Sequence, residues 1–180
     1  MYFQDYFSRF HRAVSDVDEA TLEHFAELLR KIRDGKGKTL VAGNGGSAAI
    51  ASHVAIDFTK AAGLPTMCFN EAGLLTCLSN DFGYEQWVEK ALEYYATPRD
   101  LVVLISSSGR SPNMLRGAQK AREMGLPIVT LTGFSPDNPL KQMGDVNFWV
   151  NSECYNIVEN AHQVWLLAVS DRVANIDFNK

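Results

Sequence analysis

Residues 100–113 read DLVVLISSSGRSPN: an apolar run, three serines, a glycine, an arginine, a fourth serine and a proline. The apolar run Leu101–Ile105 is rich in β-branched residues and predicts a buried strand. Ser111 is a favoured N-cap, and Pro112 suits the first helical position. We therefore expect a strand, a serine loop and a helix in direct succession.

The same order of strand, turn and helix recurs along the chain. Apolar runs that end in glycine or polar turns are KTLVAG, PTMCFN, DLVVLISSS, PIVTLTG and VNFWVN. Strands that alternate with helices imply right-handed crossovers and a mostly parallel sheet covered on both faces. The sequence therefore predicts an α/β fold, a three-layer α/β/α sandwich with about five parallel strands.

Helical periodicity marks both ends of the chain. Residues 20–37 form an amphipathic pattern that stops at Gly35, and the preceding aromatic segment is also predicted to be helical. Residues 153–175 predict a long closing helix. The residues expected to face inward are Leu22, Phe25, Ala26, Leu29 and Ile32 in the first pattern, and Ile157, Ala161, Val164, Leu167 and Ala168 in the last.

Composition narrows the class of protein. The chain has 180 residues, 46% of them hydrophobic and 21% charged, which fits one globular domain over 1–180, with N-terminal helices at 1–35 and an α/β core at 38–175. A net charge of −4 without a basic run argues against nucleic acid or an anionic membrane as main partner.

Localisation is predicted from cysteine usage and from apolar runs. The three cysteines lack CxxC spacing, which argues against a disulfide framework and a thiolate zinc site. No apolar run approaches the roughly 20 residues of a membrane span, and the N-terminus lacks a leader pattern. We expect a cytoplasmic protein.

The serine loop is a candidate phosphate site. In parallel α/β sheets, ligands bind where the carboxyl ends of strands feed loops, and helix N-termini there attract anions. Ser106, Ser107, Ser108 and Ser111 would supply hydroxyl groups to a phosphate monoester. The alternative is a serine-rich turn that only caps a helix. Serine is a poor filler beside a buried strand, and Gly109 allows close approach of a ligand.

A second glycine loop, in VAGNGGSAAIASHVAIDF, carries two interpretations. Gly43, Gly45 and Ala48 meet the dinucleotide fingerprint, and Glu71 follows the next run, where an acidic residue would bind a ribose. This hypothesis, an NAD(P)-dependent enzyme, leaves the serine loop unexplained. The simpler alternative is a tight turn before a helix.

Taken together, the motifs are those of a known family. GNGGSAA, HVAIDFT, SNDFGYE, ISSSGRSPN and AREMGLPIVTLTG resemble, in order and spacing, the sugar isomerase (SIS) domain family, and in particular its phosphoheptose isomerase branch. The resemblance runs from about residue 38 to the end. It implies a flavodoxin-like five-stranded parallel sheet, a homotetramer with sites at subunit interfaces, and aldose–ketose isomerisation of sedoheptulose 7-phosphate or a related sugar phosphate.

The resemblance assigns roles to individual residues. It implies that Ser106, Ser108 and Ser111 hold the phosphate, with Ser107 beside them. Asn44, Gly45 and Ser47 would lie at the sugar, and Asp81 would lie near it. Arg110 stands where the family commonly has asparagine and is an additional candidate for the phosphate.

The catalytic pattern of the branch is incomplete in this chain. The branch uses a glutamate after the glycine loop, here Asp57, and a histidine on the last helix, here Leu166; Val158 stands at the expected glutamine. Some members bind zinc, for which His53 and Asp57, at i and i+4, are candidate ligands. His162 is a candidate relocated acid or third ligand. The alternatives are a His53–Asp57 helix pair and an interior His162.

Two further hypotheses follow from these losses and from the first helix. Non-enzymatic relatives include a regulator that associates with the replication initiator protein, so a phosphosugar-binding protein without catalysis is the second hypothesis. Aromatic residues on the first helix suggest an interface between copies of the chain, unless that helix packs on its own domain. They are Tyr2, Phe3, Tyr6, Phe7 and Phe10.

Overall fold

A five-stranded parallel sheet forms the centre of the molecule. The computed structural model describes residues 1–177. The strands lie in the order β2-β1-β3-β4-β5, and every neighbouring pair is parallel. Their bounds are Thr39–Gly43 (β1), Thr66–Cys68 (β2), Leu101–Ser106 (β3), Ile128–Thr132 (β4) and Val146–Trp149 (β5). The predicted α/β class and the five strands are confirmed.

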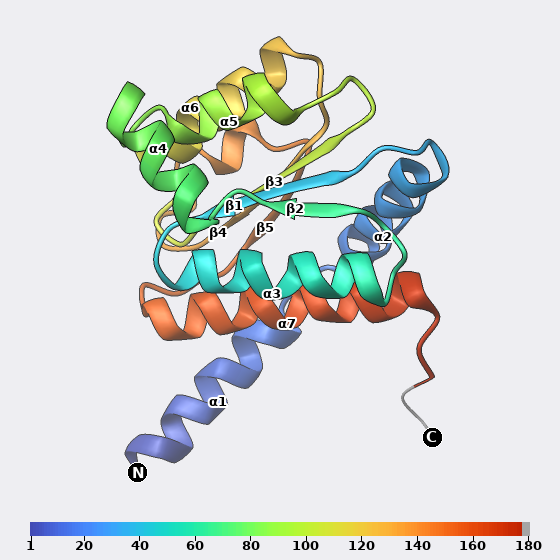
Figure 1. The fold of residues 1–180 in the computed structure, drawn as a ribbon. Coiled ribbons are helices and arrows are strands. Elements are labelled where there is room, and N and C mark those ends of the chain that lie inside the picture. The colour runs from blue at the N-terminus through green and yellow to red at the C-terminus, as the bar shows by residue number, and fades with distance from the viewer. Residues whose placement is uncertain (178–180) are drawn as a thin grey trace.

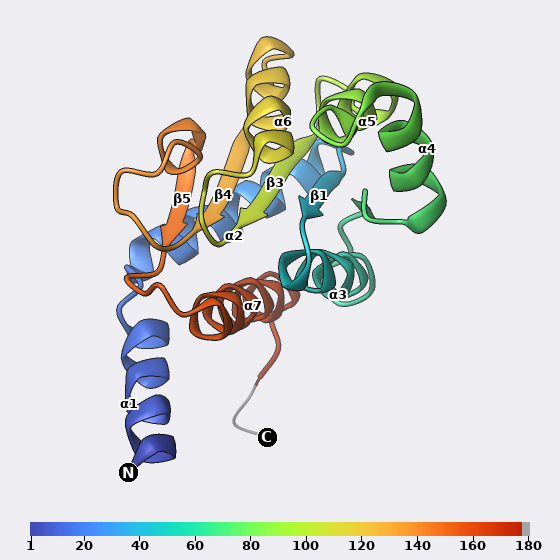
Figure 2. The ribbon, with the colours of Figure 1, turned by 90° about the vertical axis from the view of Figure 1, so that its left-hand side faces the viewer.

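Helices cover both faces of the sheet, as Figures 1 and 2 show. One face packs against α2 (Glu19–Asp34), α3 (Gly46–Lys60) and α7 (Tyr155–Ala174). The other face packs against α4 (Ala72–Phe82), α5 (Trp87–Tyr95) and α6 (Pro112–Glu123), and a short 3₁₀ helix, η1, covers Lys141–Met143.

The strand side chains divide between these two layers because successive residues of a strand point to opposite faces. In β3, Val103 and Ile105 join the core beneath α3 and α7, whereas Val102 and Leu104 join the core beneath α5 and α6. All of β3 is buried. The uninterrupted apolar run Leu101–Ile105 is therefore explained by a central strand that is covered on both faces.

The first helix, α1 (Tyr2–Ser15), stands apart from the body of the molecule, as Figure 2 shows. None of its residues is buried, and Tyr2, Phe3 and Phe7 are each more than half exposed. Its C-terminal end is attached through Trp165, whose indole N–H donates to the Val14 carbonyl at 2.9 Å. Within residues 1–177, none of the helices combines the length and apolarity needed to cross a membrane.

One sequence expectation about helices is confirmed and another needs correction. Helix α2 ends at Asp34 with Gly35 as C-cap, as expected, but Gly35 has φ −74° and the left-handed residue is Lys36 at φ 56°. In α7, Val164 and Ala168 are exposed although they were expected to face inward. The buried face contains instead Val158, His162, Trp165, Leu166 and Val169, together with Ile157 and Ala161. The expected inward positions Ile157 and Ala161 are therefore confirmed, Leu167 is only partly buried, and Val164 and Ala168 were wrong.

The chain changes direction across the sheet between β1 and β3. Strand β1 continues into α3 on one face, and the adjacent β3 continues into α6 on the other. In register, Gly43 pairs with Ile105, so the glycine loop and the serine loop leave the same edge side by side. Such a topological switch point is where open α/β sheets bind ligands.

Candidate functional site

A cavity of about 250 Å³ opens at this switch point. Three segments supply its walls: the glycine loop after β1, the serine loop after β3 and the first turns of α7. The residues that line it are Asn44, Gly45, Gly46, Ser47, Ile105, Ser106, Ser107, Ser108, Ser111, Tyr155 and Glu159. The structure therefore brings together both predicted loops, including all four serines.

The serine hydroxyl groups are arranged to accept a ligand. Ser106 Oγ and Ser111 Oγ lie 3.1 Å apart and hydrogen-bond to each other. Ser107 Oγ is buried and has no hydrogen-bond partner within the described part of the chain. A buried polar group without a partner costs free energy, so this hydroxyl calls for a further acceptor or donor in the cavity. An anionic oxygen fits that requirement.

The start of α6 adds backbone donors to the serine loop. Ser111 is the N-cap residue and Pro112 begins the helix, as the sequence predicted. The Ser111 side chain makes no capping hydrogen bond, because its hydroxyl faces Ser106 instead. The first N–H groups of a helix have no partners within the helix and carry partial positive charge. This end of α6 is therefore open to an anion.

Gly109 fixes the shape of the serine loop. Its φ is +63°, a left-handed conformation that favours glycine, and a β-carbon there would overlap the Asn138 side chain. Asn138 is fully buried and uses Nδ2 to donate to the carbonyls of Gly133 and Ser135. The serine loop therefore packs closely against Asn138, and a residue with a β-carbon at position 109 would displace the Asn138 side chain.

Asn44 joins the two loops across the cavity. Its Nδ2 donates to Asn113 Oδ1 at 3.0 Å, and Asn113 Nδ2 donates back to Asn44 Oδ1 at 2.9 Å. The Tyr84 hydroxyl also donates to Asn44 Oδ1 at 3.0 Å. Asn44 therefore has a positioning contact that the sequence did not reveal, in addition to its place in the cavity wall.

Two cavity residues, Tyr155 and Glu159, were not among the predicted site residues. They lie one turn apart on α7, so their side chains share a face of the helix. Tyr155 packs edge-on against Phe134, with ring centroids 4.8 Å apart. The sequence indicated only weakly that Glu159 belongs to the site. Glu159 is adjacent to Val158, which stands at the position of the expected glutamine.

Two predicted sugar and phosphate contacts lie outside the cavity. Asp81 is exposed on α4, where its carboxylate accepts a hydrogen bond from Asn80 Nδ2 at 3.0 Å. Arg110 is also exposed, and its backbone N–H donates to Ser108 Oγ at 3.3 Å. Neither side chain lines the cavity in this chain.

The predicted pair His53 and Asp57 also lies away from the cavity. His53 Nε2 and Asp57 Oδ2 are 3.5 Å apart on the outer surface of α3, and both side chains are more than one-third exposed. Gln163 of α7 lies 3.1 Å from His53 Nδ1. The cavity wall includes only the first turn of α3, so the interpretation as a helix pair describes this geometry.

His162, the candidate relocated acid, lies in the core and does not line the cavity. Its side chain is fully buried, and Nε2 lies 2.9 Å from the Thr132 carbonyl oxygen, to which a protonated Nε2 donates. Burial lowers the pKa of His162 to about 4, although the hydrogen bond to Thr132 opposes this shift. The alternative of an interior histidine therefore fits the structure.

The residues present do not fit the zinc site that the resemblance implied. Among residues 1–177, no three His, Cys, Asp or Glu side chains converge as metal ligands. Val158 and Leu166, at the positions expected to hold glutamine and histidine, are buried in the apolar core. The expected set of His53, Asp57 and His162 is thus divided between the surface and the interior.

Glu71, the acidic residue of the dinucleotide hypothesis, has a local structural role. It is the N-cap of α4, and its carboxylate accepts hydrogen bonds from the N–H groups of Gly73 and Leu74 at 3.0 and 2.8 Å. These bonds lower the pKa of Glu71 below its ordinary value. A ribose would have to compete with the helix for this carboxylate.

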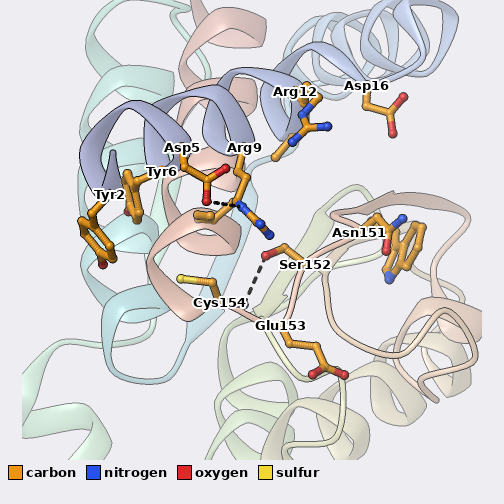
Figure 3. A pocket seen from close by; sticks show the side chains of 13 residues that line it. Tyr2, Asp5, Tyr6, Arg9, Arg12, Asp16, Asn151, Ser152, Glu153 and Cys154 are labelled. Carbon is orange, nitrogen blue, oxygen red and sulfur yellow. Dashed lines mark hydrogen bonds and ion pairs between the residues drawn. The ribbon is translucent and has the colours of Figure 1, made fainter.

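A larger cavity, of about 600 Å³, lies between α1 and the segment that follows β5, as Figure 3 shows. Its charged groups are of both signs, and Arg9 Nε forms an ion pair with Asp5 at 3.0 Å. It exists because α1 projects from the body of the molecule. Neither the glycine loop after β1 nor the serine loop after β3 lines this cavity. We therefore do not assign a phosphate site to it.

The fold and the cavity define a doubly wound α/β protein with a serine-lined cavity at its switch point. Comparison with known proteins gives the family: the chain belongs to the SIS domain family, whose model matches residues 2–133. The predicted resemblance is confirmed.

Similar proteins place the chain near one branch of that family. It is 32% identical over 161 residues to the phosphoheptose isomerase of Fusobacterium nucleatum, covering 87% of this chain and 82% of that protein. It is 34% identical over 134 residues to the phosphoheptose isomerase of Proteus mirabilis, covering 72% and 69%. The structure of phosphoheptose isomerase GmhA from Neisseria gonorrhoeae superimposes with a TM-score of 0.88, at 26% identity and coverage of 96% and 97%.

Proposed function

We propose that this chain is a sugar-phosphate aldose–ketose isomerase that acts on sedoheptulose 7-phosphate or a closely related substrate. The observation that carries the proposal is the cavity lined by four serines, one of which has a buried hydroxyl without a partner among residues 1–177. Similar proteins named phosphoheptose isomerase support the choice of substrate class.

In this proposal Ser106, Ser107, Ser108 and Ser111 bind the phosphate together with the N-terminus of α6. The sugar extends toward Asn44, Gly45 and Ser47, which line the same cavity. Isomerisation then moves a proton between the first two carbons, and this needs one group that serves as base and acid in turn.

We also propose that the protein works as a homotetramer in the cytoplasm. The aromatic face of α1, exposed at Tyr2, Phe3 and Phe7, supports contact with another copy of the chain. The three free cysteines support a reducing compartment.

The experiment is proton NMR of sedoheptulose 7-phosphate in D₂O with the purified protein. Deuterium at C1 or appearance of the aldose supports the isomerase. Line broadening of the sugar without exchange supports the second candidate, a phosphosugar-binding protein without catalysis, which the buried Val158 and Leu166 favour. Absence of any interaction would exclude both.

A further inference from the structure

Glu159 faces the serine cavity from the opposite wall. It lies on the second turn of α7, is half-buried, and lines the cavity together with Ser47 and the serine loop. Its carboxylate rests against Gly46, the first residue of α3, so closely that a β-carbon on Gly46 would overlap it. Gly46 therefore leaves the space that this carboxylate occupies.

The carboxyl group has the properties of a proton carrier. Among the described residues that line the cavity, Glu159 has the only carboxyl group, and Tyr155 is the only other ionisable side chain. No described residue hydrogen-bonds or ion-pairs with the Glu159 carboxylate. Burial raises the pKa of Glu159 above its ordinary value. A carboxyl group with a raised pKa exchanges protons more readily near neutral pH.

A purely structural role does not explain this group. A half-buried carboxylate without a partner costs stability, because nothing replaces the water that it loses. Glu71, by contrast, is a carboxylate at a helix end that is paired, because it accepts hydrogen bonds from the backbone of α4. Glu159 thus resembles a functional residue whose partner is the ligand.

We propose that Glu159 is the acid–base residue of the isomerisation, a role that rests on the function proposed above. With the phosphate on the serine loop, the carbon chain crosses the glycine loop toward Glu159. Asp57, the carboxylate expected from the sequence, lies about 16 Å farther along α3 than Gly46 at about 1.5 Å per residue. Within a single chain it does not line the cavity.

The proposed step balances without any further reagent. The Glu159 carboxylate takes a proton from C1 of the ketose: the C1–H bond breaks, a C1–C2 double bond forms, and the carbonyl oxygen at C2 becomes negative. The proton on O1 passes to O2 within this enediolate. The Glu159 carboxylic acid then returns its proton to C2, while C1 becomes the carbonyl carbon of the aldose. Glu159 ends in its initial ionised state.

The test compares four proteins in D₂O with sedoheptulose 7-phosphate. They are the wild type, Glu159→Gln, Asp57→Asn, and the control Glu27→Gln, whose residue is exposed on α2. Because general acid–base groups contribute about 10²- to 10⁴-fold to rate, we expect Glu159→Gln to lose exchange at C1 by at least about 10²-fold. Its affinity for the sugar phosphate should stay within about threefold of wild type. The control should exchange normally.

A second variant tests the geometry without altering Glu159 itself. Gly46 does not have a positive φ, so alanine fits the backbone there, and its methyl group must displace the flexible end of Glu159. We expect Gly46→Ala to keep or increase its unfolding temperature and to lose exchange at C1.

A third variant tests chemical rescue. Formate should restore part of the exchange in Glu159→Ala, because a small carboxylate can occupy the vacated space.

The outcomes separate this inference from the proposed function. Exchange by Glu159→Gln within tenfold of wild type, or a loss confined to Asp57→Asn, overturns the assignment to Glu159 and leaves the isomerase standing. A wild type that binds the sugar phosphate without exchange overturns both the assignment and the isomerase. A wild type that does not bind sugar phosphates overturns the proposed function itself.

Discussion

Asn44 and Asn113 exchange two amide hydrogen bonds, of 3.0 and 2.9 Å, across the boundary between the glycine loop and α6. Asn113 is almost completely buried. The pair therefore couples the two halves of the cavity: the residue that follows β1 cannot move without disturbing the helix that follows β3.

Replacing Asn113 by alanine should remove this coupling. Asn44 would keep the Tyr84 contact but lose a buried donor–acceptor pair, which costs about 1–3 kcal/mol of unfolding free energy. Urea denaturation measures the loss, and sugar-phosphate affinity should fall with it. The exposed Asn160→Ala, whose side chain bonds only to its own helix, serves as control and should change stability little. Equal stability of both variants would contradict the coupling.

The serine loop should bind the phosphate group of the sugar phosphate. Ser106→Ala and Ser111→Ala each remove one hydroxyl group from the cavity, and hydrogen bonds to charged groups are worth about 1.5–3 kcal/mol. We expect each variant to weaken binding of sedoheptulose 7-phosphate at least tenfold by calorimetry. Ser15→Ala, at the exposed end of α1, should bind normally. An unchanged affinity in both loop variants would show that the phosphate binds elsewhere.

His162 should make the fold sensitive to acid. Its folded pKa of about 4 lies below the ordinary 6.5, so the unfolded chain takes up a proton in this range and the folded chain does not. Stability is therefore lost as pH falls from about 6.5 to about 4, by on the order of 3 kcal/mol.

His162→Gln retains a donor for the Thr132 carbonyl and cannot ionise. Subtracting its unfolding free energy from that of wild type at each pH isolates the effect of the histidine. A difference that stays constant between pH 7 and pH 4 would contradict a buried neutral His162.

Asp100 should stabilise the start of β3. Its carboxylate is almost completely buried and accepts hydrogen bonds from Lys38 Nζ at 2.5 Å, Lys38 N at 3.0 Å and Thr97 N at 2.7 Å. Burial alone would raise the pKa of Asp100, but these bonds lower it below its ordinary value. The stabilisation is therefore present above the ordinary pKa and lost as pH falls through the folded pKa.

Asp100→Asn should cost about 2 kcal/mol at neutral pH, measured by urea denaturation. Asp34→Asn removes a mostly exposed carboxylate that pairs with Arg33 and should cost less than about 1 kcal/mol. Equal losses in the two variants would show that burial of Asp100 adds nothing.

The aromatic face of α1 should control assembly. Replacing Phe3 and Phe7 together by lysine places charge on a surface that is more than half exposed in the single chain. If this surface contacts another copy, sedimentation should show a smaller species than wild type, whereas Gln4→Lys, on the same helix, should keep the native mass. A wild-type monomer would contradict the proposed tetramer.

Much of the fold was predictable because its signals are local. Each strand appeared as an apolar run before a glycine or polar turn, and α2 appeared as a helical stripe containing Phe25 and Leu29. The buried face of α7 was predicted less well. Apolar residues occur nearly all round that helix, so the sequence pattern does not select one face. Packing against α2 and α3 selected it.

The sequence by itself determined the parallel α/β class and the two loops, because strand, turn and cap preferences are properties of neighbouring residues. Tertiary structure alone decided which distant side chains enter the cavity. The first turns of α7 lie against the glycine loop, so Glu159 reaches the cavity while His162 lies in the core. Asp57 follows the glycine loop closely in sequence, yet the rise of α3 carries it beyond the site.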